Sequence, residues 1–170
     1  MNGAKGFSLI ELLITIAIAG TLTAIAVFGT EGIRTGYRVR GATRLVYGDM
    51  QMARLMALKE GKEMAVEFTS ATAYCIKRKA GANWVAGCGA GGDTIIKTVD
   101  LSGGYSGVNA TSICGAATGR VNFNANGTAG CTGNRVTLSK DSRVQHLCIT
   151  TGTGRIRIKD MDPLNPTSCS

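Results

Sequence analysis

The stretch KGFSLIELLITIAIAG, residues 5–20, opens an apolar run that continues to Phe28 and contains one formal charge, Glu11. At 1.5 Å per residue, a helix over residues 7–28 is long enough to cross a bilayer. A lone carboxylate in hydrocarbon costs about 2.5–3.5 kcal/mol even on lenient scales, so Glu11 needs a partner. Lys5 precedes the run, and the positive-inside rule then places the N-terminus in the cytoplasm and the bulk of the chain outside.

Three explanations of this segment compete. A secretory signal peptide could be cut after residues 17–19, but Glu11 near the start of the apolar region argues against it. A plain signal anchor leaves Glu11 unexplained. If the chain is instead cut after Gly6, the new amine of Phe7 is a cation four residues before Glu11. Two subunits staggered by about a turn could then pair amine with carboxylate, and an unpaired buried charge would be strongly destabilising.

The same residues resemble the leader and first residues of a type IV pilin or pseudopilin. The resemblance covers residues 5–20 and implies that prepilin peptidase cuts after Gly6, that Phe7 is N-methylated and that Glu11 is the assembly glutamate. It implies other pilins, prepilin peptidase and the inner membrane as partners. The chain would cross the inner membrane once with its bulk in the periplasm, and would then enter a pilus or pseudopilus. Many pilins have a proline near the end of the apolar run, and this chain has none there.

The helical pattern continues beyond the apolar run and becomes amphipathic over residues 29–61. Apolar residues and glycines recur there mostly at steps of three and four, which predicts the buried face. These are Ile33, Tyr37, Gly41, Leu45, Gly48, Met52, Leu55 and Met56. Arginines fall mostly on other faces and are interpreted as solvated. Residues 7–60 are therefore predicted as one long helix that stops at Gly61.

Residues 62–170 alternate between short apolar runs and glycine-rich breaks, which predicts a meander of antiparallel strands. The predicted strands cover residues 64–68, 73–78, 84–85, 95–99, 120–123, 135–138 and 144–159. A long helix followed by strands gives the α+β class. The predicted organisation is a leader at residues 1–6, a membrane or filament-core helix at 7–28, its amphipathic continuation at 29–61 and a globular domain of antiparallel strands at 62–170.

Six cysteines lie in the part of the chain predicted to be exported: Cys75, Cys88, Cys114, Cys131, Cys148 and Cys169. An even number of cysteines behind a membrane-targeting segment predicts disulfides in an oxidising compartment. Six cysteines allow fifteen pairings, and proximity in the sequence makes Cys75–Cys88 the simplest one. No CxxC pair is present and His146 is the single histidine, so no metal site is predicted.

A second resemblance lies in the C-terminal half. Residues 120–128, 136–138, 147–150 and 154–157 resemble the FimT/GspH family of minor pilins in strand spacing and in the Phe-x-x-x-Gly turn. This resemblance implies a minor pilin present in few copies near the filament tip. The alternative is a GspH-type pseudopilin of a type II secretion system that binds no nucleic acid, and the leader is common to both.

The strongest binding signal is Gly154-Arg155-Ile156-Arg157-Ile158-Lys159. Alternation along a strand places Arg155, Arg157 and Lys159 on one face, about 6.6 Å apart, and the two isoleucines on the other. This suits phosphates along one strand of double-stranded DNA, with Arg143 assisting. The pattern is similar to the DNA-contacting Gly-Arg-x-Arg motif of FimT-type minor pilins used in DNA uptake.

The competing explanation is a charged strand face that protects an exposed sheet edge. The formal net charge of +8 is compatible with both. No catalytic constellation and no cofactor motif is recognised, so the chain is not predicted to be an enzyme.

Overall fold

The computed structural model describes residues 8–28, 31–89, 92–114, 119–130, 135–160 and 169. The chain divides into two compact units, residues 1–35 and 36–170. In the first unit, helix α1 (Leu9–Phe28) begins after Ser8, whose carbonyl oxygen accepts hydrogen bonds from the amides of Glu11 and Leu12. The apolar side chains of α1 are exposed from Leu9 to Ile25. Among the described residues, no helix has the length and apolarity needed to cross a bilayer.

Helix α2 (Glu31–Glu60) belongs to the second unit from Gly36 onward. It ends one residue before Gly61, where the sequence predicted the stop. The predicted single helix is therefore described as two helices, and residues 29 and 30 lie outside the described residues.

The buried face of α2 differs from the predicted one. It combines three alanines with three larger apolar side chains at steps of three and four: Val39, Ala42, Val46, Met50, Ala53 and Ala57. Tyr37 and Leu55 were expected to be buried but are 70% and 63% exposed. Small residues allow strands to approach the helix closely from more than one side, and a periodicity based on large apolar residues does not reveal such a face.

Gly41, which the prediction also placed in the buried stripe, is explained by a close approach. A Cβ atom at this position would lie 2.5 Å from the Tyr105 ring. The absence of a side chain on α2 therefore makes room for the tyrosine that follows β3.

The strands form two antiparallel sheets. The first has the order β3-β2-β1-β5-β6, with β1 (Met64–Phe68), β2 (Ala73–Arg78), β3 (Thr94–Asp100), β5 (Arg120–Phe123) and β6 (Ala129–Gly130). The second has the order β4-β7-β8-β9, with β4 (Asn109–Ser112), β7 (Arg135–Lys140), β8 (Arg143–Thr150) and β9 (Arg155–Asp160). The α+β class and the antiparallel pairing are confirmed. The meander is wrong, because β5 pairs with β1 and β4 belongs to the other sheet.

Strand assignments differ from the prediction at three places. Residues 84–85 lie in the loop between β2 and β3, β4 and β6 were not expected, and the run 144–159 is divided by a turn into β8 and β9. The two unexpected strands were missed because β4 is largely polar and β6 is only two residues long. Neither gives an alternating apolar signal of useful length.

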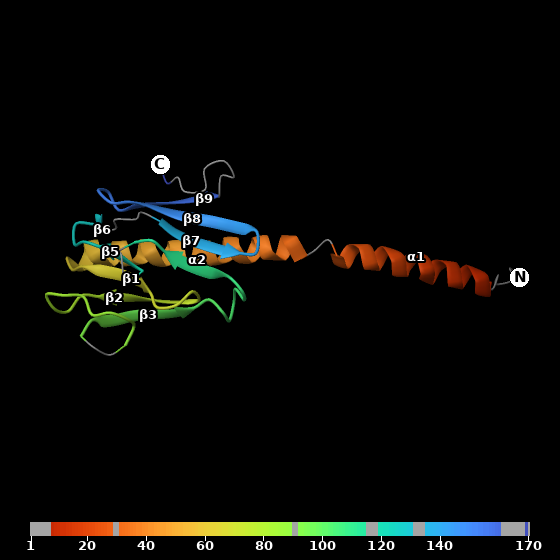
Figure 1. Ribbon diagram of the computed structural model, residues 1–170, viewed down its shortest axis with the longest axis horizontal. Coiled ribbons are helices and arrows are strands. Elements are labelled where there is room, and N and C mark those ends of the chain that lie inside the picture. The colour runs from red at the N-terminus through yellow and green to blue at the C-terminus, as the bar shows by residue number, and fades with distance from the viewer. Residues whose placement is uncertain are drawn as a thin grey trace, which may run out of the picture. The chain divides into compact units, whose positions relative to one another are not determined.

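The core is one cluster in which α2 contributes to the burial of both sheets. Figure 1 shows α2 running between β1–β3 and β7–β9. Buried side chains from the first sheet include Val66, Tyr74 and Phe123, and those from the second include Leu138 and Leu147. The β9 edge of the second sheet, which carries the predicted DNA-binding residues, thus belongs to the same folded unit as residues 36–60 of α2.

Disulfides add covalent links to this unit. Cys75 pairs with Cys88, as predicted, and Cys148 pairs with Cys169. Cys114 is disulfide-bonded as well, and Cys131 lies outside the described residues. The first bond joins β2 to the loop that follows it.

Candidate functional site

Strand β9 presents the predicted arginines on an exposed face at the edge of its sheet. In the β8–β9 register, Arg155 lies opposite Thr150, Arg157 opposite Cys148 and Lys159 opposite His146. Arg155 and Arg157 are exposed, whereas Lys159 is half-buried. The two arginines are therefore brought together as expected and are open to a ligand.

Two neighbouring expectations fail. Arg143 is exposed, but its register places it on the side of the sheet that carries Leu147, away from Arg155 and Arg157. Ile156 is buried as expected, whereas Ile158 is 40% exposed. Ile158 is exposed because β9 is an edge strand, and its far end borders an open groove rather than the core.

This groove runs between β9 and α2 and has a volume of about 580 Å³. Its lining consists of two residues from the helix and four from the strand: Tyr47, Gln51, Arg155, Ile156, Arg157 and Ile158. Gln51 donates a hydrogen bond to the Tyr47 hydroxyl, which holds the two helix side chains together across one turn. Arg155 and Arg157, here called the arginine row, thus lie beside a groove that is open to solvent.

Gly154, the first residue of the Gly-Arg-x-Arg pattern, has a structural role. Its φ is +64°, in the left-handed region, and a Cβ atom there would lie 2.0 Å from the Gly127 carbonyl oxygen. Arg54 of α2 donates hydrogen bonds to the carbonyls of Gly127 and Thr153, both at 2.9 Å. The turn before β9 is therefore fixed to α2 and to the turn after β5, which sets the position of the arginine row.

The predicted processing and assembly residues lie at the N-terminus. Glu11 is exposed in the first turn of α1. Gly6 and Phe7 lie outside the described residues.

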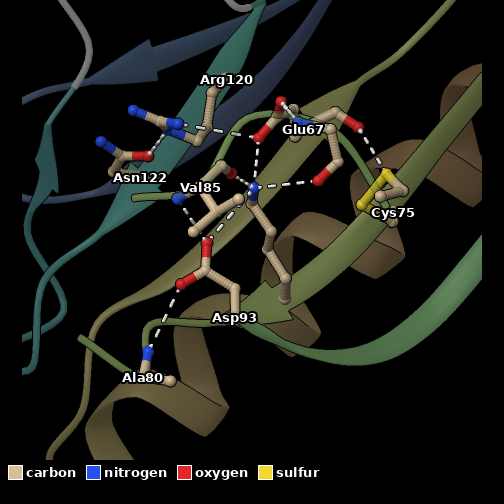
Figure 2. A network of polar contacts seen from close by, with 10 residues as sticks. Glu67, Cys75, Ala80, Val85, Asp93, Arg120 and Asn122 are labelled. Carbon is tan, nitrogen blue, oxygen red and sulfur yellow. Dashed lines mark hydrogen bonds and ion pairs between the residues drawn. A yellow bond between two sulfur atoms is a disulfide. The ribbon is translucent and has the colours of Figure 1, made fainter. Parts of the chain in front are cut away.

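Sequence reasoning missed a buried charge network under the loop between β2 and β3 (Figure 2). The Lys77 ammonium lies 2.6 Å from a Glu67 carboxylate oxygen and 3.4 Å from Asp93, and all three side chains are buried. It also donates to the carbonyls of Val85 and Gly87. No sequence motif predicts this network, because its members are spread from β1 to the end of the loop between β2 and β3. The one available signal was a lysine directly after the apolar residues of β2.

The two carboxylates also accept hydrogen bonds from the loop backbone. Glu67 accepts one from the Gly87 amide at 2.6 Å, and Asp93 accepts from Val85 at 3.0 Å. The Trp84 ring lies in this loop with the Lys77 cation 5.7 Å and the Arg120 cation 5.2 Å from its centroid. These contacts fix the loop between β2 and β3 to the first sheet. Within the described part of the chain, no group of three His, Cys, Asp or Glu side chains could bind a metal ion.

A second buried polar contact joins α2 to the first sheet. Tyr74 donates a hydrogen bond to Asp49 at 2.8 Å, and Lys97 lies 2.6 Å from the same carboxylate. Burial first, and then the hydrogen bond to Asp49, raise the pKa of Tyr74 far above its ordinary value.

Comparison with protein families gives two matches along the chain. Residues 42–154 match the type II transport protein GspH, and residues 1–27 match the prokaryotic N-terminal methylation motif. The chain belongs to the GspH family. It is accordingly a minor pilin or pseudopilin of a type II secretion system or type IV pilus, and this family is structural rather than catalytic. No curated protein and no solved structure matches the chain.

The two family matches cover some of the predicted site residues and not others. The methylation motif covers Gly6, Phe7 and Glu11, whereas the GspH match ends at Gly154, one residue before Arg155. Family membership therefore supports the filament role of the N-terminal segment. It does not extend to the arginine row on β9.

Proposed function

We propose that the chain is a low-copy subunit of a pilus or pseudopilus, held in the inner membrane by residues 7–28 before assembly and located near the filament tip. Prepilin peptidase cuts after Gly6 and the new Phe7 amine is methylated. The methylation motif over residues 1–27 carries this proposal. The exposed apolar side chains of α1 agree with it, because a helix with apolar residues all round requires a lipid or protein environment.

Glu11 sets the register of assembly in this proposal. In an apolar filament core its carboxylate pairs with the N-terminal amine of a neighbouring subunit, and loss of one partner leaves the other charge buried at a cost of about 3–5 kcal/mol. Glu11→Ala and Glu11→Gln should both block incorporation while leaving membrane insertion intact.

Two measurements test the filament role. N-terminal sequencing of the mature protein should begin at Phe7, and an uncut Met1 or a start at Gly20 would contradict the proposed processing. Immunoblots of sheared filaments and of membranes should show both Glu11 variants in membranes alone, with Thr15→Val as the neighbouring control that still assembles. Normal amounts of the Glu11 variants in filaments would contradict the register role.

A second candidate role is weak binding of double-stranded DNA, without sequence preference, through Arg155 and Arg157. It is favoured by one observation: both arginines are exposed on one face of an edge strand, at alternate positions. Strand geometry separates alternate residues by about 6.6 Å, and an arginine can bind phosphate oxygens with two hydrogen bonds. A pilin with this property would serve DNA uptake in transformation, whereas a pseudopilin without it would serve secretion.

Salt dependence tests the DNA-binding role. Non-specific affinity rests on the neutralisation of phosphates and should be about 10⁻⁶–10⁻⁴ M at physiological salt. Arg155→Gln with Arg157→Gln should reduce the slope of log affinity against log salt by roughly 1.8, equally for unrelated sequences. Circular dichroism controls for folding. An unchanged slope would show that the arginines only protect the sheet edge.

A further inference from the structure

We propose that the edge of β9 that faces away from β8 is a docking site for an extended segment of another protein, which adds to the second sheet as an antiparallel strand. The segment that fits carries acidic side chains at alternate positions and apolar side chains between them. This inference goes beyond the filament role and does not require DNA binding.

Strand β9 offers backbone groups to such a segment. It ends the order β4-β7-β8-β9, and among the described residues it pairs with β8 alone. Alternate residues of an edge strand direct their N–H and C=O groups away from the sheet, where a further strand can bind them. The strand covers Arg155–Asp160. At about 3.3 Å per residue this is about 20 Å of extended chain, so a segment of about six residues matches the edge.

The two faces of β9 differ in chemistry, and the β8–β9 register assigns them. Ile156 lies opposite Ile149, a core residue, so Ile156 and Ile158 are on the face that is directed toward α2. Arg155 and Arg157 lie on the opposite, outer face of the sheet. Side chains of an added strand alternate between the same two faces. One set therefore meets the arginine row, and the other set enters the groove between β9 and α2.

This groove supplies the apolar half of the site. Ile158 is 40% exposed and lines the groove, whereas Ile156 is 3% exposed. On the helix side, the Tyr47 hydroxyl accepts a hydrogen bond from Gln51 at 3.2 Å. That hydroxyl keeps its own proton for donation to a carbonyl oxygen of the added strand. The volume of about 580 Å³ is in the range of ligand pockets, so the groove accommodates the apolar side chains of a segment and not a folded partner.

The outer face selects the charge of the segment. Arg155 and Arg157 are exposed, and within the described part of the chain neither forms an ion pair with an acidic side chain. Opposite charges on directly facing residues of two strands stabilise the pair, and like charges destabilise it. An acidic strand therefore complements the arginine row, and the net charge of +8 favours the approach of an acidic partner.

The same charges disfavour a second copy of the chain as the occupant. If another β9 were added with its isoleucines toward the groove, its arginines would lie on the outer face opposite the arginine row. This pairing places like charges against each other, which is a repulsive element against self-association at this edge. The site is therefore assigned to a segment of a different protein.

Fluorescence anisotropy with labelled synthetic peptides tests the docking site on the full chain in a neutral detergent. A short peptide in which glutamate alternates with valine should bind, and the same peptide with lysine in place of glutamate should not. Two further glutamate peptides are methylated on backbone nitrogens, those of the glutamates in one and those of the valines in the other. Because alternate residues direct their amides to opposite edges of a strand, only one of these two should lose binding.

Variants of the arginine row test the outer face. R155Q/R157Q should weaken binding of the glutamate peptide roughly 2- to 30-fold, which is the range for two exposed charge pairs. The control R38Q/K59Q removes the same charge from exposed positions on α2 and should weaken binding less.

A variant of Ile158 tests the groove. I158D places a carboxylate where the apolar side chains of the segment enter, and it should weaken binding roughly tenfold. The control I113D changes an isoleucine that is 47% exposed directly after β4, the other edge strand of the same sheet, and it should bind like the wild type. Circular dichroism controls for folding, and the methylated peptides decide the question even if a variant fails to fold.

Several results would overturn the docking site. If both methylated peptides bind like the parent peptide, binding is electrostatic and no strand is added. If folded I158D binds like I113D, the groove takes no part. Failure of the wild-type chain to bind the glutamate peptide also overturns the proposal, and binding of a DNA duplex in that case would assign the arginine row to nucleic acid. The filament role is tested separately by the processing and Glu11 experiments.

Discussion

Replacement of Lys77 by methionine tests whether the buried charge network holds the domain together. Methionine keeps most of the apolar stem of lysine but removes the ammonium group, and with it both the charge and the hydrogen bonds to the Val85 and Gly87 carbonyls. The Lys77 side chain is 1% exposed and its ammonium contacts Glu67 and Asp93, which are 4% exposed. The substitution therefore leaves two buried carboxylates without their shared cation.

The expected loss follows from the partners that remain. Glu67 keeps the Gly87 amide and Arg120, whose guanidinium is 3.7 Å away. Asp93 keeps two backbone amides. Removing one member of a buried ion pair costs about 3–5 kcal/mol, and these remaining contacts favour the lower half of that range. For a chain of this size, 3–4 kcal/mol corresponds to a fall in Tm of roughly 6–16 °C.

Arg78→Met is the matched control, because Arg78 is the next residue and forms an ion pair with Glu60 that is about one-third exposed. Exposed pairs contribute about 0–1 kcal/mol, so this variant should lose little stability. The single tryptophan of the chain, Trp84, lies in the loop above Lys77 and reports local unfolding, while circular dichroism reports the whole domain. Equal losses in Lys77→Met and Arg78→Met would refute the reasoning.

Three further predictions concern the same unit. Gly154→Ala should lower stability by several kcal/mol in thermal unfolding, because a Cβ atom would collide with the Gly127 carbonyl, and wild-type stability would show that the turn can move. Tyr74→Phe should reduce the loss of folding stability above about pH 10, because the raised pKa of Tyr74 makes the folded state bind more protons there than the unfolded state. The control Tyr37→Phe changes an exposed tyrosine and should leave the dependence of stability on pH as in the wild type. The same dependence in both variants would contradict the raised pKa of Tyr74. Replacement of Cys75 and Cys88 by alanine should lower the free energy of unfolding by about 3 kcal/mol, because the disulfide closes a loop with a sequence separation of 13. The Tm of the variant, compared with that of the wild type, tests this, and an unchanged Tm would contradict it.

The sequence predicted those features that depend on local pattern. The N-terminal segment with Glu11, the end of α2 before Gly61 and the alternate placement of Arg155 and Arg157 all follow from short spacings, which one stretch of chain contains in full. The Cys75–Cys88 pairing was also accessible, because neighbouring strands and loops most often bring close cysteines together.

The remaining features depend on contacts between distant segments. The burial of Lys77 requires partners on another strand and at the end of a loop, so no local pattern encodes it. Half of the buried face of α2 consists of alanines such as Ala42 and Ala53, whose low hydrophobicity gives little signal of their close packing. The exposure of Ile158 follows from its place on an edge strand, and strand order is not readable from alternation.

The two hydrogen bonds of Arg54 have a consequence for the time at which the domain can be completed. They join α2 to residues 73 and 99 positions later in the chain. At the usual 5–20 residues per second of synthesis, Thr153 is made roughly 5–20 s after Arg54. During that interval the second sheet is incomplete, so the part of α2 that this sheet covers lacks some of its partners. The packing of α2 is therefore completed only when the hairpin of β8 and β9 has been made.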